Sequence, residues 1–185
     1  MFVKFLAPAT LAGLVLSASL APVRAAAQQA APAPVTDSSF IQMAGSMGLL
    51  QAKLGKLAED KGSSPSVRDF GKRMAAEYAK ANEQLAAGAK QAAYPAPVML
   101  RQHQQVYDLL SRTGRGSFDK KYMAEMLTEH GDAVQLFQQE SQAGRVASLK
   151  QLASEMLPTV QQHMALATQT ATSVGAEVTA SASQR

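Results

Sequence analysis

The sequence contains no cysteine and no tryptophan, and aromatic residues make up only 5% of its 185 residues. Without cysteine the chain cannot form a disulfide, a thiolate zinc site or a cysteine nucleophile. The abundant residues, Ala, Gln, Met and Leu, favour helix. No stretch of useful length alternates apolar and polar residues as a half-buried strand does. We therefore expect an all-α protein, and the length fits one domain.

Long hydrophobic runs are also scarce, and the one that exists lies at the N-terminus. The run FLAPATLAGLVLSASLA, residues 5–21, follows Lys4 and is closed by small residues. This order is typical of a secretory signal peptide, which we place at residues 1–27. The alternative, an uncleaved membrane anchor, is disfavoured because Pro8 and Gly13 interrupt the run. We expect the protein to be secreted across an inner membrane, to the periplasm or the outer membrane.

Neither sign of charge dominates the chain. The net charge is +4, and removal of Lys4 and Arg24 with the leader lowers it to +2. No basic stripe with interleaved aromatic residues is present, so we expect no nucleic-acid partner. No other segment is apolar enough to cross a membrane, and we expect no membrane span in the mature chain. An envelope protein is the kind of partner that this location favours, but the sequence does not identify one.

Start and stop signals divide the remaining chain into helices. Residues 28–36 are rich in Pro and Ala and form a flexible linker, and residues 173–185 form a disordered tail. Between them, cap residues, glycines and the YPAP segment predict four long helices and a short one, at about 37–61, 65–93, 98–112, 117–143 and 146–172. Ser117 is the expected N-cap of the fourth. Pro158 lies inside the last and should kink it. We predict an antiparallel four-helix bundle over residues 37–172, with residues 98–112 as an extra short helix. An open array of two hairpins is the alternative.

Each long helix carries one polar residue within its apolar stripe. Drawn at 100° per residue, the four stripes enclose Gln51, Tyr78, His130 and His163. Each lies near the middle of its helix, and mid-helix positions of an antiparallel bundle meet at one level. We therefore predict a central polar layer. Such a layer is either a hydrogen-bonded network that fixes helix register or a metal or small-ligand site with His130 and His163 as ligands. The third alternative is that the helix register differs and the four residues never meet.

Glu129 and His130 are neighbours in sequence but should point in different directions. On the wheel, Glu129 falls with Glu125 and Asp132 on a ridge roughly 100° from His130. We expect this acidic ridge to face solvent. His103 falls on the apolar side of the short helix and is expected to be a half-buried packing residue rather than a ligand.

The sequence lacks the residue patterns that several kinds of catalytic and metal-binding site require. Glu-x-x-His, the signature of ferritin-type di-iron sites, is absent, because Leu100, Leu127 and Val160 stand three residues before the three histidines. No phosphate-binding glycine loop is present. The nine methionines could serve copper(I), but their spacing is that of core residues, which Met fills well. We expect no catalytic residue, no cofactor and no enzymatic activity.

Three blocks of the sequence carry a family resemblance. They contain the segment LGKLA, the pattern S-x-P-x-V-x-x-F-x-x-R-M at 63–74, FDKKYM at 118–123, and LPT followed four residues later by His163. Over residues 38–170 the chain resembles the exported bacterial "domain of unknown function 4142" family, also described as predicted outer membrane protein. The resemblance implies a ferritin-like four-helix bundle and no established reaction.

The resemblance also bears on the polar layer. His103, His130 and His163 match family histidines, whereas Gln51 stands where the family commonly has Glu, and Glu77-Tyr78 stand where it has Asp-His. The layer thus keeps two histidines but lacks a carboxylate and a third imidazole. Our main hypothesis is an exported, non-catalytic bundle with a structural, interaction or envelope-stress role. The alternative is a metal- or small-ligand-binding protein that uses His130 and His163.

Overall fold

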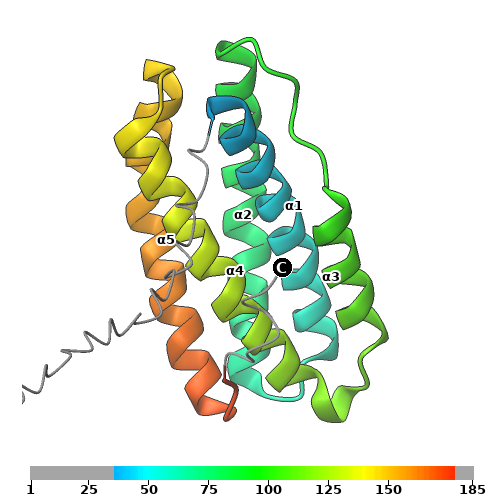
Figure 1. The fold of residues 1–185 in the computed structure, drawn as a ribbon. Helices are drawn as coiled ribbons and strands as arrows, with labels where there is room; N and C mark the ends of the chain where they lie inside the picture. Colours follow the sequence, from blue (N-terminus) through cyan, green and yellow to red (C-terminus); the bar gives the residue numbers. More distant parts are fainter. Residues whose placement is uncertain (1–35, 178–185) are drawn as a thin grey trace, which may run out of the picture. The chain divides into compact units, whose positions relative to one another are not determined.

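The computed structural model describes residues 36–177 (Figure 1). They form five helices and no strand: α1 (Asp37–Lys61), α2 (Pro65–Gln91), α3 (Arg101–Arg112), α4 (Arg115–Ala143) and α5 (Ala147–Ser173). This confirms the expected all-α class. Within the described range, no helix has the length and apolarity needed to cross a membrane. The signal peptide, the linker up to residue 35 and residues 178–185 of the tail lie outside the described residues.

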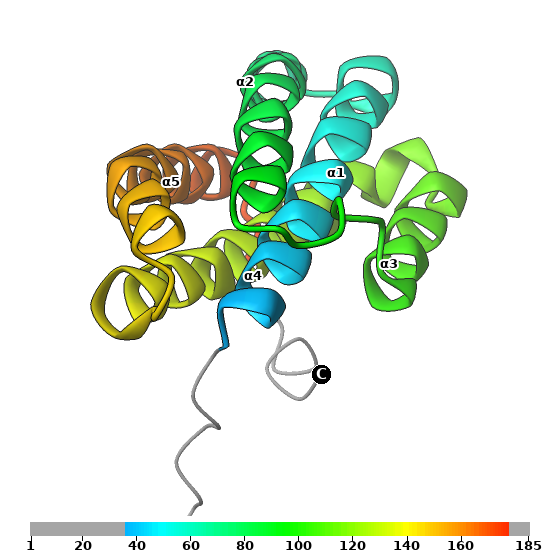
Figure 2. The ribbon, with the colours of Figure 1, turned by 90° about the horizontal axis from the view of Figure 1, so that it is seen from above.

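The four long helices form the expected antiparallel bundle. α1 pairs with α2 and α4 with α5, and the two hairpins join through contacts of α1 with α4 and of α2 with α5. Figures 1 and 2 show that each of these neighbours runs opposite to the next, whereas α3 lies outside the bundle beside α1. The connection through α3 returns the chain to the end of the bundle from which α4 starts. The alternative of an open array is thereby excluded.

Most local signals operate as expected. Thr36 and Ser39 form a reciprocal capping box at the start of α1, and Gly62 follows its end. Five boundaries differ from the prediction by one to three residues, and two of these are helix starts with a local cause. α3 starts at Arg101, because the chain is still extended at Leu100, and α4 starts at Arg115 with Gly114 as N-cap, so Ser117 lies inside the helix. α5 remains helical through Pro158.

The short helix α3 is fastened to α1 at both ends. At its start, the backbone N–H of Leu100 donates to the hydroxyl of Ser46 over 2.7 Å. At its end, the ammonium of Lys61 donates to the carbonyls of Ser111 (2.6 Å) and Thr113 (2.7 Å). The last carbonyls of a helix have no partner within it, so a cation there satisfies them. These contacts place α3 over the face of α1 that α2 leaves free.

The hairpin of α1 and α2 depends on two glycines. A Cβ added at Gly55 would lie 2.5 Å from the carbonyl oxygen of Gly71 and 2.6 Å from the backbone nitrogen of Ala75. Added at Gly71, it would lie 2.6 Å from the carbonyl oxygen of Gly55. The two backbones are therefore in direct contact, and only glycine permits that approach.

The opposite end of the bundle contains a buried carboxylate pair. Asp37 accepts hydrogen bonds from the backbone N–H groups of Arg145 (2.8 Å) and Val146 (2.7 Å), and so joins the start of α1 to the α4–α5 turn. Burial alone would raise the pKa of Asp37, but these bonds outweigh it and the pKa is lowered. The neighbouring Glu140 is 1% exposed, and burial together with the charge of Asp37 raises its pKa to about 7.

The glycine contact gives a first prediction. Gly55→Ala should lower the free energy of unfolding by about 1–3 kcal/mol, because the added methyl group forces the two helices apart. Urea denaturation followed by circular dichroism measures the change. Gly131→Ala in α4 is the matched control, since a Cβ there meets no atom within 4 Å, and it should raise stability by about 0.5–1 kcal/mol. Equal effects of the two substitutions would contradict the argument.

A second prediction concerns Glu140. Its pKa is raised from 4.5 to about 7, so the folded state binds more protons than the unfolded state between these values. Stability from this group is therefore present below pH 4.5 and is lost as pH rises through 7. Glu140→Gln should be more stable than the wild type by about 1–3 kcal/mol at pH 8 and show no gain at pH 4.5. A gain that is independent of pH in thermal unfolding would refute it.

Candidate ligand-binding site in the bundle core

Three rings from three helices meet in the middle of the bundle. The centroids of His130 (α4) and His163 (α5) are 5.9 Å apart, and Tyr78 (α2) lies 6.0 Å from the first and 5.3 Å from the second. All three side chains are buried, with His130 fully enclosed. The structure thus brings together three of the four residues that the helical wheels place at one level.

The fourth residue, Gln51 of α1, lines a cavity with two of these rings. The cavity has a volume of about 290 Å³, and Gln51, Tyr78 and His163 all contribute to its wall. The side-chain oxygen of Gln51 is buried and has no hydrogen-bond partner among the described residues. Methionine sulfurs are also near, because Met47 and Met156 line the same space.

His130 is held in one tautomer. Its Nδ1 lies 2.8 Å from the carbonyl oxygen of Met126, one turn back in α4. Because a carbonyl only accepts, Nδ1 must carry the proton, which leaves a lone pair on Nε2. Nε2 is buried and no described residue pairs with it. Burial lowers the pKa of His130 to about 4, so the imidazole is neutral at physiological pH.

His163 is held by Glu77, which sequence reasoning did not identify as its partner. Nε2 of His163 lies 2.5 Å from a carboxylate oxygen of Glu77, and the other oxygen accepts from Arg73 over 2.7 Å. Burial alone would raise the pKa of Glu77, but the bonds from His163 and Arg73 outweigh it and lower the pKa. In the neutral imidazole, Nδ1 of His163 then carries the lone pair, and it too is buried without a partner.

Glu129 corrects the expectation of a solvated acidic ridge. Its side chain is 7% exposed, at the point where His103 of α3 approaches α4. Its carboxylate lies 3.8 Å from Nε2 of His103. His103 is itself 3% exposed rather than half-buried, and its Nδ1 lies 2.5 Å from the hydroxyl of Ser46. Burial lowers the pKa of His103, so this imidazole is uncharged at neutral pH.

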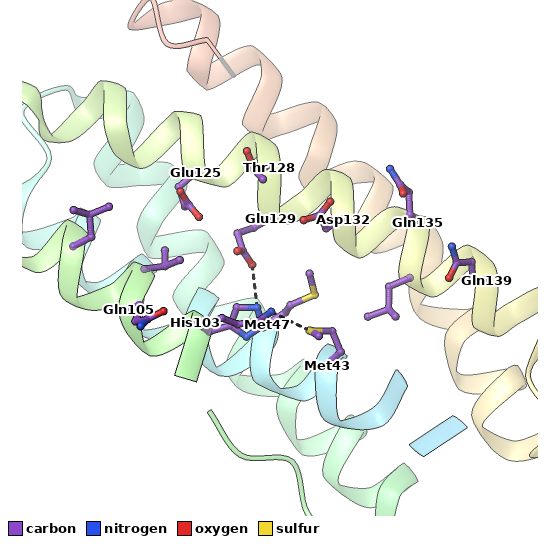
Figure 3. Close-up of a pocket in the computed structure, with 14 residues that line it drawn as sticks. Met43, Met47, His103, Gln105, Glu125, Thr128, Glu129, Asp132, Gln135 and Gln139 are labelled. Carbon is purple, nitrogen blue, oxygen red and sulfur yellow. Dashed lines mark hydrogen bonds and ion pairs between the residues drawn. The ribbon is translucent and has the colours of Figure 1, made fainter. Parts of the chain in front are cut away.

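A second, larger hollow lies between α4 on one side and α1 and α3 on the other. We call it the outer groove; it has a volume of about 830 Å³. Figure 3 shows Glu125, Glu129 and Asp132 of α4 facing His103 of α3 and the methionines of α1. Met47 and Glu129 line both the outer groove and the inner cavity. These two side chains therefore form the wall between them.

Glu129 acts electrostatically on the inner layer through this wall. Burial raises the pKa of Tyr78 above its usual range, and the negative charges of Glu129 and Glu77 raise it further. Glu129 and His130 nevertheless have different neighbours, as the wheel indicates: Glu129 contacts His103 at the groove, whereas His130 packs against Tyr78 and His163.

The layer offers ligand atoms rather than an acid–base pair. Nε2 of His130 presents a lone pair, Nδ1 of His163 does so in the neutral imidazole, and the opposite nitrogen of each ring is oriented by an oxygen acceptor. This is the arrangement that proteins use around metal-binding histidines. Within residues 36–177, no three His, Cys, Asp or Glu side chains are grouped so that they could hold a metal ion. The cavity beside His163 adds the phenol of Tyr78, the amide of Gln51 and the thioether of Met47.

Comparisons with known proteins agree with the fold. A family model described as a domain of unknown function (DUF4142) matches residues 21–170. A solved structure titled "CopM in the Cu(II)-bound form" is similar over 76% of this chain and 99% of its own, with a TM-score of 0.62 and 16% identity. At that identity the likeness shows the fold alone. None of the curated proteins compared matches the sequence.

The state of His130 can be tested directly. Its imidazole should titrate with a pKa of about 4 and carry its proton on Nδ1 at pH 7, as measured by nitrogen-15 NMR. Since the unfolded value is about 6.5, the unfolded chain binds more protons between pH 6.5 and 4, and this group's contribution to stability falls as pH drops through that window. A pKa near 6.5, or a proton on Nε2, would refute this assignment.

Proposed function

The chain belongs to the DUF4142 family, and we propose that it is an exported, non-catalytic bundle that binds a copper ion between His130 and His163. The observation that carries the proposal is the pair of buried imidazole nitrogens without a partner, Nε2 of His130 and Nδ1 of His163. A buried polar atom without a partner costs free energy, so a native structure that keeps two of them on rings whose centroids are 5.9 Å apart calls for an explanation.

The spacing of the rings suits a shared ion. Imidazole nitrogens bind such metals at about 2.0–2.1 Å. Ring centroids 5.9 Å apart are within the span of one ion at that distance from each ring. The supporting contacts are also those of a metal site, since Glu77 orients His163 and the Met126 carbonyl orients His130.

The thioether groups of the neighbouring cavity favour copper over hard cations. Met47 and Met156 line that cavity together with His163. Imidazole and thioether ligands suit copper, whereas Mg²⁺ and Ca²⁺ take oxygen ligands. The fold similarity to a protein titled as Cu(II)-bound supports the same choice without transferring any ligand.

The remaining parts of the proposal have separate support. Export is supported by the leader features of residues 1–27. A non-catalytic role is supported by the protonation states: a His130 pKa of about 4 lies far from the operating pH that suits a general base. In addition, Nε2 of His163 is occupied by Glu77.

Metal analysis of the purified chain tests the proposal. Expression with added copper, zinc and iron, followed by elemental analysis, should give about one copper per chain, and copper should raise the melting temperature. His130→Ala and His163→Ala should each abolish stoichiometric copper. Glu77→Gln should weaken binding about tenfold, since it removes the carboxylate that orients a ligand.

His103→Ala is the matched control, because it also removes a buried histidine but lies at the outer groove. It should leave the copper content unchanged. The proposal is refuted if the wild type binds no copper and shows no thermal shift, if zinc or iron binds in its place, or if the His103 variant loses copper as the other two do.

A further inference from the structure

The outer groove has the dimensions of a helix-binding slot. On α4 its lining residues run from Glu125 to Gln139, which corresponds to about 20 Å at 1.5 Å per residue. The facing wall is α3, which the contacts of Ser46 and Lys61 hold on α1 rather than on α4. α3 and α4 consequently touch little along their length, and the space between them is open.

The wall that α1 and α3 form combines apolar side chains with Gln102, His103 and Gln105, and the α4 wall contains the acidic residues. Met43, Val106 and Leu109 supply apolar surface from α1 and α3. Leu109 is 53% exposed, and only one other large hydrophobic residue of the described range, Val98, is more exposed. Leu109 lines the groove together with Met43, so its exposed side chain extends the apolar surface there.

The opposite wall is negatively charged. α4 contributes Glu125, Glu129 and Asp132, and none of the fourteen described residues that line the groove is Lys or Arg. Glu125 is half-buried and Asp132 is exposed, so both can meet a ligand from solvent. A cleft lined by one sign of charge attracts the opposite sign and excludes its own.

We propose that the outer groove docks a cationic amphipathic helix of a partner protein. The apolar stripe of that helix lies on Met43, Val106 and Leu109, and its Lys and Arg side chains face Glu125 and Asp132. Amphipathic helices bind hydrophobic grooves in this way, and methionine side chains adapt to their irregular surfaces. The inference is independent of copper, because it uses a different face of α4 from the one that carries His130.

Peptide binding to the full chain tests the proposal. The probe is a fluorescently labelled amphipathic helix of Leu and Lys, with a Leu and Glu peptide of the same pattern as its counterpart. Fluorescence anisotropy should show saturable binding of the Leu/Lys peptide and none of the Leu/Glu peptide. Glu125→Gln combined with Asp132→Asn should weaken binding about tenfold, as expected for two partly exposed charge pairs.

Two further variants separate docking from general attraction. Leu109→Gln should weaken binding about fivefold, because it removes half-exposed apolar surface without disturbing the core. Glu59→Gln combined with Glu83→Gln changes the net charge equally, on exposed positions of α1 and α2 outside the groove, and should leave affinity unchanged. Equal loss in this control, equal binding of the Leu/Glu peptide, or no binding at all would overturn the proposal. So would concentration-dependent dimers in sedimentation equilibrium that Leu109→Gln abolishes, since the occupant would then be a second copy of the chain.

Discussion

The attachment of α3 to α1 is the constraint on which the outer groove and the burial of His103 depend. Ser46 accepts a hydrogen bond from the start of α3, and Lys61 donates hydrogen bonds to its end. The short helix therefore lies along α1, although the next helix in the sequence is α4. This position buries Glu129 beside His103 and leaves the outer groove open. Without α3 there, the acidic face of α4 would be an ordinary solvated surface. One short segment therefore creates both the buried carboxylate and the hollow next to it.

The central layer shows how a helical core can contain polar groups without containing charge. His130 is neutral because burial lowers its pKa more than the hydrogen bond to the Met126 carbonyl raises it, and that bond fixes the tautomer of the neutral ring. His163 is supported from the rim by Glu77, which is itself held by Arg73. The carboxylate that supports His163 thus lies at the edge of the bundle, where water screens it, and the imidazole nitrogens without a partner lie inside. That division is suited to holding a ligand and poorly suited to moving protons.

The sequence predicts the inner layer better than its surroundings, for a physical reason. Helical periodicity fixes which face a residue occupies, and four such faces must meet in a bundle, so Tyr78, His130 and His163 could be placed together from the wheel alone. A wheel does not indicate what covers the other faces. The burial of Glu129 and the contact of Ser46 with His103 arise from α3, across 57 residues of sequence. The contact of Glu77 with His163 was not predicted, because Glu77 lies at the border of the apolar stripe of α2 and its long side chain reaches His163.

Met47 and Glu129 line both the outer groove and the inner cavity, so ligand binding in one space can be coupled to ligand binding in the other. A ligand in either space that shifts the position or charge of this wall alters the free energy of binding in the other. Linkage then requires the effect to be reciprocal: whatever factor the outer occupant imposes on the inner affinity, the inner occupant imposes on the outer. His130 and Glu129 point in different directions from α4. Binding on the His130 side of the helix can therefore affect binding on the Glu129 side through one layer of side chains.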